Sequence, residues 1–70
     1  MNLQTKKWAP YLEGKFFTLR TKETNNRIRT CRIVWNVVAY LEVVDQLGRF
    51  RVDLSERRLK EILELACSSH

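Results

Sequence analysis

The chain has 70 residues and a formal net charge of +5, because 13 Lys and Arg side chains oppose 8 Asp and Glu side chains. A hydrophobic fraction of 44% excludes an intrinsically disordered chain, which would carry few large apolar residues. This length supports one domain, residues 1–70, and a domain this small buries only about 60% of its unfolded surface. We therefore expect marginal stability and reliance on a partner, often a copy of the same chain.

The spacing of charges, cysteines and histidine excludes several kinds of site. The longest run without a charged residue, 33–41, is far shorter than the roughly 20 residues of a membrane helix. Cys31 and Cys67 lie far apart without CxxC spacing, and the single histidine, His70, is terminal, so neither a zinc site nor a disulfide framework is expected. The sequence predicts no metal, no cofactor, no membrane segment and a reducing, cytoplasmic setting.

Residues 1–14 form the least regular segment, and residues 1–6 are expected to be loose. Pro10 favours the first turn of a short helical piece over 10–13, which Gly14 would end. Three apolar side chains of this segment are expected to fold back as a lid on the sheet: Trp8, Tyr11 and Leu12.

Two β-prone runs, 15–22 and 27–35, follow in the chain. Between them lie Asn25 and Asn26, and asparagine tolerates the left-handed backbone of a tight turn. The sequence therefore predicts a first antiparallel hairpin.

The stretch 28–45 is too long for one ordinary strand. Asn36 is its only plausible interruption, so we expect a bend, bulge or turn near Trp35 and Asn36. Alternation places Trp35 on the same side as Cys31 and Ile33, and a large aromatic on this side is expected in the core.

A second hairpin is predicted from 37–45 and 49–54. The intervening residues 46–48 form a three-residue loop with Gly48 at a position that needs a positive φ. Strict alternation places three apolar residues of the second strand on one side: Phe50, Val52 and Leu54.

The C-terminal residues 55–67 have the pattern of an amphipathic helix, with an N-cap at Ser55 or Asp53. The apolar stripe is Leu59, Ile62, Leu63 and Ala66. The apolar stripe of an amphipathic helix must be buried against another element, which in this chain is the sheet. We therefore expect one group to be buried together: Phe50, Val52, Leu54, Leu59, Ile62 and Leu63.

The predicted order is β-β-β-β-α, mostly β with a C-terminal helix: an irregular segment 1–14, a sheet in 15–54 and a helix in 55–67. Two architectures fit this order. One is a small SH3-like or Sm-like antiparallel barrel plugged by the helix, and the other is an open four-stranded antiparallel sheet with one helix across it.

The run Tyr40-Leu41-Glu42-Val43-Val44, followed by Gly48 and 49–54, resembles the closing hairpin of Sm-like and SH3-like small barrels, including the Rho-inhibitor type. This resemblance spans 38–54, roughly a quarter of the chain. It implies the barrel fold and carries no activity over.

Positive charge is concentrated in residues 1–40, which contain eight basic and two acidic side chains, whereas 41–70 contain five and six. Basic side chains interleaved with an aromatic ring bind phosphates and stack an unpaired base. Lysine and arginine also protect edge strands from aggregation, which is the alternative interpretation. The candidate nucleic-acid or partner-binding residues are Lys15, Phe16, Arg20, Lys22, Arg27, Arg29 and Arg32, with Trp8 as an exposed contact.

No catalytic site is predicted. No nucleophile and base form a pair, and the only glycines, Gly14 and Gly48, make no phosphate-binding loop. Asp45 and Asp53 are placed on facing strands, beside arginines, and are expected to be ion-paired surface residues.

The sequence therefore favours a small non-enzymatic module that binds RNA or single-stranded DNA through the basic hairpin. The alternative is a protein-interaction module, a small regulator or inhibitor that docks its basic face on an acidic partner protein. A homodimer through strand pairing or sheet packing is also expected, because four apolar residues exceed what one side of a small sheet can bury: Val37, Val38, Leu41 and Val43.

Overall fold

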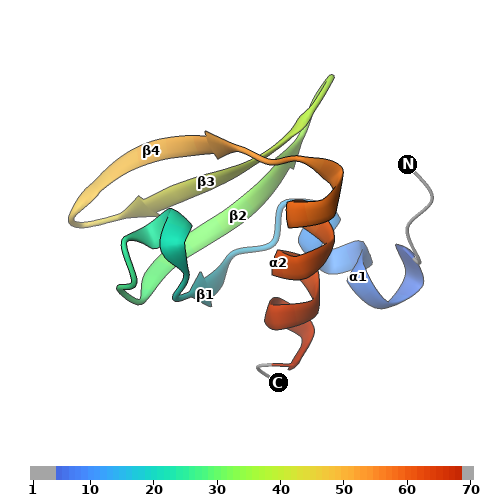
Figure 1. Ribbon diagram of the computed structural model, residues 1–70, viewed down its shortest axis with the longest axis horizontal. Helices are drawn as coiled ribbons and strands as arrows, with labels where there is room; N and C mark the ends of the chain where they lie inside the picture. The colour runs from blue at the N-terminus through green and yellow to red at the C-terminus, as the bar shows by residue number, and fades with distance from the viewer. Residues whose placement is uncertain (1–4, 69–70) are drawn as a thin grey trace.

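The chain folds as a four-stranded antiparallel sheet followed by a C-terminal helix (Figure 1). The computed structural model describes residues 5–68. The strands pair in chain order, so the sheet is open, with β1 and β4 at its edges, and of the two predicted architectures the open sheet is confirmed. The elements are α1 (Thr5–Leu12), β1 (Phe17–Leu19), the 3-10 turn η1 (Lys22–Thr24), β2 (Arg29–Trp35), β3 (Ala39–Asp45), β4 (Gly48–Asp53) and α2 (Glu56–Ser68).

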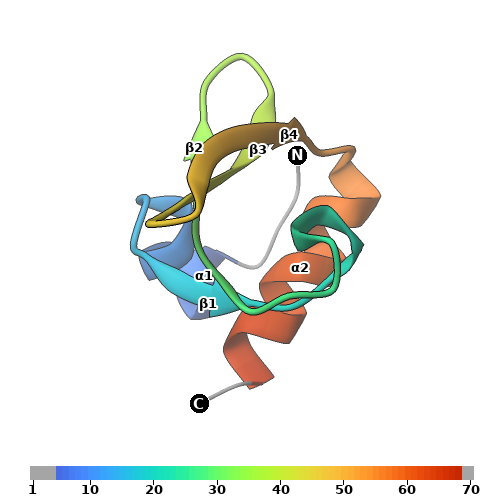
Figure 2. The same ribbon diagram turned by 90° about the vertical axis from the view of Figure 1, so that its left-hand side faces the viewer.

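The sheet curls, and α2 lies across its concave side (Figure 2). Buried residues alternate along β2 and β3, and cross-strand pairs such as Ile33 with Leu41 keep the buried side chains in register. The core therefore lies between the concave side of the sheet and the helices. It contains the predicted helix stripe, with Leu59, Ile62 and Leu63 completely buried.

The predicted boundaries of α2 hold to within one residue. Its N-cap is Ser55, whose Oγ accepts a hydrogen bond from the backbone N–H of Arg58 at 3.1 Å. Of the two predicted caps, the structure therefore selects Ser55 over Asp53.

The N-terminal segment is more regular than predicted. α1 begins at Thr5, within the stretch expected to be loose, and residues 1–4 lie outside the described part of the chain. Trp8 is only 4% exposed, so its assignment as an exposed contact was wrong. The ring of Tyr11 packs edge-on against Phe17 with centroids 5.4 Å apart, which confirms the predicted lid.

The turns follow the predicted local chemistry. Asn25 and Asn26 adopt φ values of 55° and 60°, the left-handed conformation expected of the first turn. Gly48 has a φ of 141° and pairs directly with Asp45, so the second hairpin has a two-residue loop and not the predicted three. A turn also follows Trp35, as predicted, and reverses the chain into β3.

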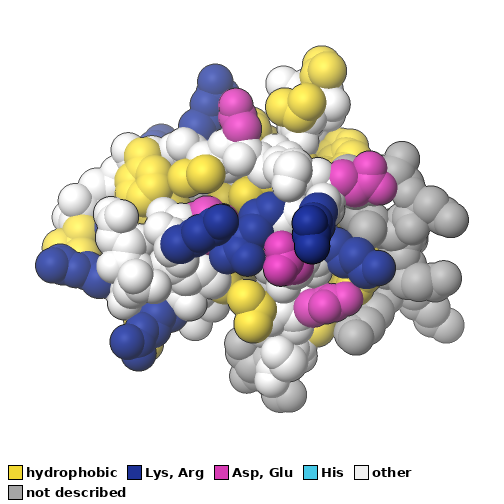
Figure 3. Space-filling view, viewed as in Figure 1, with side chains coloured by type: hydrophobic (Ala, Val, Ile, Leu, Met, Phe, Trp, Pro, Cys, Tyr) yellow, Lys and Arg dark blue, Asp and Glu magenta, His cyan; other side chains and the backbone are white. Residues whose placement is uncertain are grey.

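Three residues that were predicted to lie in the core do not belong to it. Trp35 is 47% exposed because it ends β2 at the turn, beyond the cover of the helices. Phe50 is 37% exposed and Val52 is half-buried, because β4 is an edge strand, and only Leu54 joins the core from this segment. Hydrophobic side chains protrude at the tip of the β2–β3 turn (Figure 3), where Val37 and Val38 are exposed.

Candidate nucleic-acid interface

The convex side of the sheet, which faces away from α2, is called the open face here. Its side chains come from all four strands and from the residue before β1, and every one of them is exposed or half-buried. Strand alternation and register assign to the open face Phe16, Thr18, Thr30, Arg32, Val34, Tyr40, Glu42, Val44, Arg49, Arg51 and Asp53.

Five of these residues form a continuous arrangement, the aromatic–arginine row. The guanidinium of Arg32 lies over the ring of Phe16, 5.4 Å from its centroid, and its Nε donates to the carboxylate of Glu42. Glu42 is also the cross-strand partner of Arg51. The guanidinium of Arg51 in turn lies over the ring of Tyr40, 5.0 Å from its centroid.

The row offers both chemical groups that single-stranded nucleic acids require. Phe16 is 52% exposed, and the Arg32 side chain is partly exposed despite its ion pair. Aromatic rings and guanidinium planes stack unpaired bases, and arginine keeps its positive charge for phosphates at every physiological pH. Glu42 lies between the two arginines and reduces the local positive charge.

A hollow of about 260 Å³ borders the row beside Arg32. It is lined by Leu12 at the end of α1, by the next two residues, and by residues 32–35 of β2. The half-exposed Trp35 belongs to this lining, although strand alternation places its side chain on the side of β2 opposite to Arg32.

Arg29, a predicted binding residue, lies on the other side of the sheet and is only 8% exposed. Its Nε and Nη2 both donate to the carboxylate of Asp45, and Nη2 also donates to the carbonyl of Gly48 at 3.3 Å. The hydrogen bonds from Arg29 hold the pKa of Asp45 below its usual range. Arg29 is thus occupied within the fold, and its assignment to an exposed binding surface was wrong.

Asp45 and Asp53 do not approach one another. Asp45 pairs with Gly48 at one end of the β3–β4 hairpin, whereas Asp53 pairs with Tyr40 at the other end. Asp45 is ion-paired, as predicted, but its partner is Arg29 of β2 and not the neighbouring Arg49 or Arg51.

The other predicted basic residues, Lys15, Arg20, Lys22 and Arg27, are exposed and lie outside the row. Arg20 follows β1, and its Nε donates to the carbonyl of Asn26 at 3.1 Å, inside the turn. Lys22 belongs to η1, which an ion pair attaches to α2. Only Phe16 and Arg32 of the predicted residues meet in the row.

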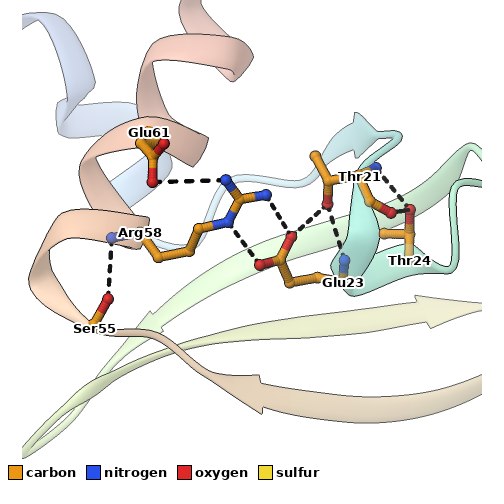
Figure 4. A network of polar contacts seen from close by, with 6 residues as sticks. All are labelled: Thr21, Glu23, Thr24, Ser55, Arg58 and Glu61. Atoms are coloured by element: carbon orange, nitrogen blue, oxygen red, sulfur yellow. Dashed lines mark hydrogen bonds and ion pairs between the residues drawn. The ribbon is translucent and has the colours of Figure 1, made fainter.

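The attachment of η1 depends on Glu23, whose side chain is only 5% exposed (Figure 4). Arg58 of α2 donates from Nε and Nη2 to the two carboxylate oxygens at 2.7 and 2.8 Å, and Thr21 Oγ1 donates to Oε1 at 2.7 Å. The hydrogen bonds from Arg58 lower the pKa of Glu23 to about 2.

Sequence reasoning missed Tyr40 and Arg51. Both lie in the second hairpin, which has no excess of basic residues, so the charge count drew attention to the first hairpin. The available signal was alternation, since aligning the two predicted hairpins puts Arg32, Glu42 and Arg51 on the same side of the sheet.

Within residues 5–68, no group of three or more His, Cys, Asp and Glu side chains could hold a metal ion. Cys31 is a buried free thiol, and burial raises its pKa to about 11. Neither described helix is long and apolar enough to cross a membrane. Comparison of the chain with protein-family models, with curated proteins and with solved structures found no match.

Proposed function

We propose that the protein is a small non-enzymatic module that binds single-stranded RNA or DNA on the open face of its sheet. The observation that carries this proposal is the aromatic–arginine row, in which Arg32 covers Phe16 and Arg51 covers Tyr40. The proposal keeps the partner expected from the sequence and moves the site from the basic hairpin to the middle of the sheet.

Bases and phosphates have separate roles at this site. An unpaired base stacks on the ring of Phe16 or Tyr40, or on the outer plane of the arginine above it, because both are flat and polarisable. The phosphates between bases contact Arg32, Arg51 and the exposed Arg49. Stacking and phosphate contacts do not depend on base identity, so binding is expected to tolerate many sequences.

The charge component is tested by fluorescence anisotropy with a labelled random-sequence oligonucleotide at several salt concentrations. The Arg32→Gln, Arg51→Gln double variant removes both charges and keeps a hydrogen-bond donor beside Glu42. Each lost phosphate contact lowers the slope of log affinity against log salt by about 0.7, so the pair lowers it by about 1.4. The matched control is Arg57→Gln, Lys60→Gln on the exposed surface of α2, which is expected to leave the slope unchanged.

The stacking component is tested with Phe16→Ala. Loss of one stacked base weakens binding by about 1–3 kcal/mol and leaves the salt slope unchanged. Glu42→Gln is expected to tighten binding, because it removes a negative charge between the two arginines. The proposal fails if no oligonucleotide binds at low salt, or if the α2 control lowers the slope as much as the row variant. A single acidic protein captured through Arg32 and Arg51, with no oligonucleotide binding, would assign the open face to protein recognition instead.

A further inference from the structure

The free edge of β4 is the longest unpaired strand edge in the described part of the chain. β4 spans Gly48–Asp53 and pairs only with β3, whereas the other edge strand, β1, has three residues. In Figure 1 no element lies beyond β4 on its outer side. An exposed edge of this kind presents unpaired backbone N–H and C=O groups and is a template for another strand.

The register of the second hairpin determines which backbone groups are free. Gly48 and Asp45 close the two-residue loop, and the N–H of Leu54 donates to the carbonyl of Ala39 at 3.0 Å, so even-numbered residues of this segment hydrogen-bond to β3. The backbone groups of Arg49, Arg51 and Asp53 consequently point to the open edge.

The charged side chains along the β4 edge are complementary to those of a second β4 strand that runs antiparallel to it. When two β4 strands run antiparallel about a two-fold axis at Arg51, Arg49 of each copy lies opposite Asp53 of the other, which gives two opposite-charge pairs. Sliding the strands by two residues in one direction places Arg49 opposite Arg51 twice. Sliding them in the other direction places Arg51 opposite Asp53 twice, but it leaves only three residues of each strand paired, so fewer backbone groups are satisfied.

We infer that β4 pairs antiparallel with β4 of a second copy, in the register that places Arg49 opposite Asp53. The partner strand is thus supplied by a second copy of this chain, because this register pairs the free backbone groups and places opposite charges next to each other. Phe50 lies opposite Val52 of the second copy on the other side of the strands, which covers apolar surface that α2 leaves exposed.

The one unfavourable contact is Arg51 opposite its own copy at the axis. Its guanidinium lies back over Tyr40 of β3 and beside the strand partner Glu42, which directs the charge away from the edge. Leu41 and Val43 have no part in this interface. They are completely buried within one chain, so the apolar excess that predicted a dimer from the sequence does not supply its contacts.

The inference is tested without nucleic acid, by sedimentation equilibrium of the full chain from about 10 µM to 1 mM, a range suited to a small interface. The variants are Arg49→Glu, Asp53→Arg and the two combined. Each single reversal turns two opposite-charge pairs into two like-charge pairs and is expected to raise the dimer dissociation constant at least about 10-fold. The combined variant restores opposite charges and is expected to return within about 3-fold of the wild type.

Lys60→Glu on α2 is the matched control for Arg49→Glu, since it changes the net charge equally and lies away from β4. Far-ultraviolet circular dichroism verifies that each variant is folded. A wild-type chain that stays monomeric to 1 mM overturns the inference. So do single reversals that act no more strongly than Lys60→Glu, and a combined variant that does not recover.

Discussion

Four arginines of this chain fall into two groups by the contacts they make. Arg29 and Arg58 each donate hydrogen bonds from Nε and Nη2 to one carboxylate, that of Asp45 or Glu23. Arg29 thereby links β2 to β3, and Arg58 links α2 to η1. Arg32 and Arg51 instead lie over aromatic rings on the open face. The first group stabilises the fold, whereas the second remains accessible on the open face together with Arg49, so the count of basic residues overstates the binding surface.

Glu23 makes the stability of the protein sensitive to acid. Its pKa is about 2 in the folded chain against an ordinary value of 4.5, so the folded state is favoured above pH 4.5 and loses this contribution as the pH falls toward 2. The expected loss is on the order of 2 kcal/mol, because solvent reaches part of Arg58 and screens the pair. The measurement is urea denaturation of wild type and Glu23→Gln across this pH range, with Glu23→Gln expected to vary less.

Glu61→Gln is the control for this comparison. Glu61 lies 3.7 Å from Arg58 but is largely exposed, so this variant is expected to keep the acid sensitivity of the wild type. Asp45 contributes equally to the pH dependence of unfolding in all three proteins, so its contribution cancels in the comparison. Equal pH dependence in Glu23→Gln and wild type would show that the ion pair does not couple folding to pH.

Among the elements, α2 has the predicted buried stripe, but it packs only in part against the residues that were predicted to contact it. Its apolar stripe is buried as predicted and packs mainly against β1, β3 and α1, whereas of the predicted partners Phe50, Val52 and Leu54 only Leu54 joins the core. Edge position explains the difference, since an edge strand of a curled sheet lies outside the area that one helix covers.

Ile62→Ala tests the packing of α2. Ile62 is completely buried, so truncation removes its packing contacts and leaves a cavity, with an expected cost of about 2–4 kcal/mol in the free energy of unfolding. Leu65→Ala on the exposed side of the same helix is expected to change stability by less than about 1 kcal/mol. Urea denaturation measures both, and similar losses in the two variants would contradict the observed orientation of the helix.

At the scale of the whole molecule, three elements close the concave side of the sheet. α2 crosses it, α1 packs against β2 and α2, and η1 is attached through Glu23 and Arg58 (Figures 2 and 4). The hydroxyl of Tyr11 donates to the carbonyl of Ala66 at 3.4 Å and links α1 to α2. The small core is thus completed by contacts between the two ends of the chain.

The two tryptophans report on this closure. In Trp35→Phe the remaining Trp8 is buried, so its emission is expected at shorter wavelength and with weak quenching by acrylamide. In Trp8→Phe the remaining Trp35 is half-exposed, so its emission is expected at longer wavelength and with several-fold stronger quenching. Fluorescence titration measures this difference, and the opposite order would show that α1 does not cover the core.

The amino-acid sequence by itself determined the element order, the left-handed turn at Asn25 and Asn26, the positive φ of Gly48 and the buried stripe of α2. These features depend on neighbours within a few residues, whose periodicity and conformational preferences can be read directly along the chain. The same reading selected Phe16 and Arg32, two members of the aromatic–arginine row, because both lie in the basic hairpin.

Only the tertiary structure decided that the sheet is open, that Trp8 is buried, that Trp35 is exposed and that Arg29 is unavailable. Alternation separates the two sides of a strand, but it does not say which side the helices will cover or how far their cover extends. That outcome depends on contacts between distant residues, such as Glu23 with Arg58 and Tyr11 with Ala66. Burial then separates arginines that hold the fold together from arginines that can meet a ligand, because only a side chain that solvent reaches can contact one.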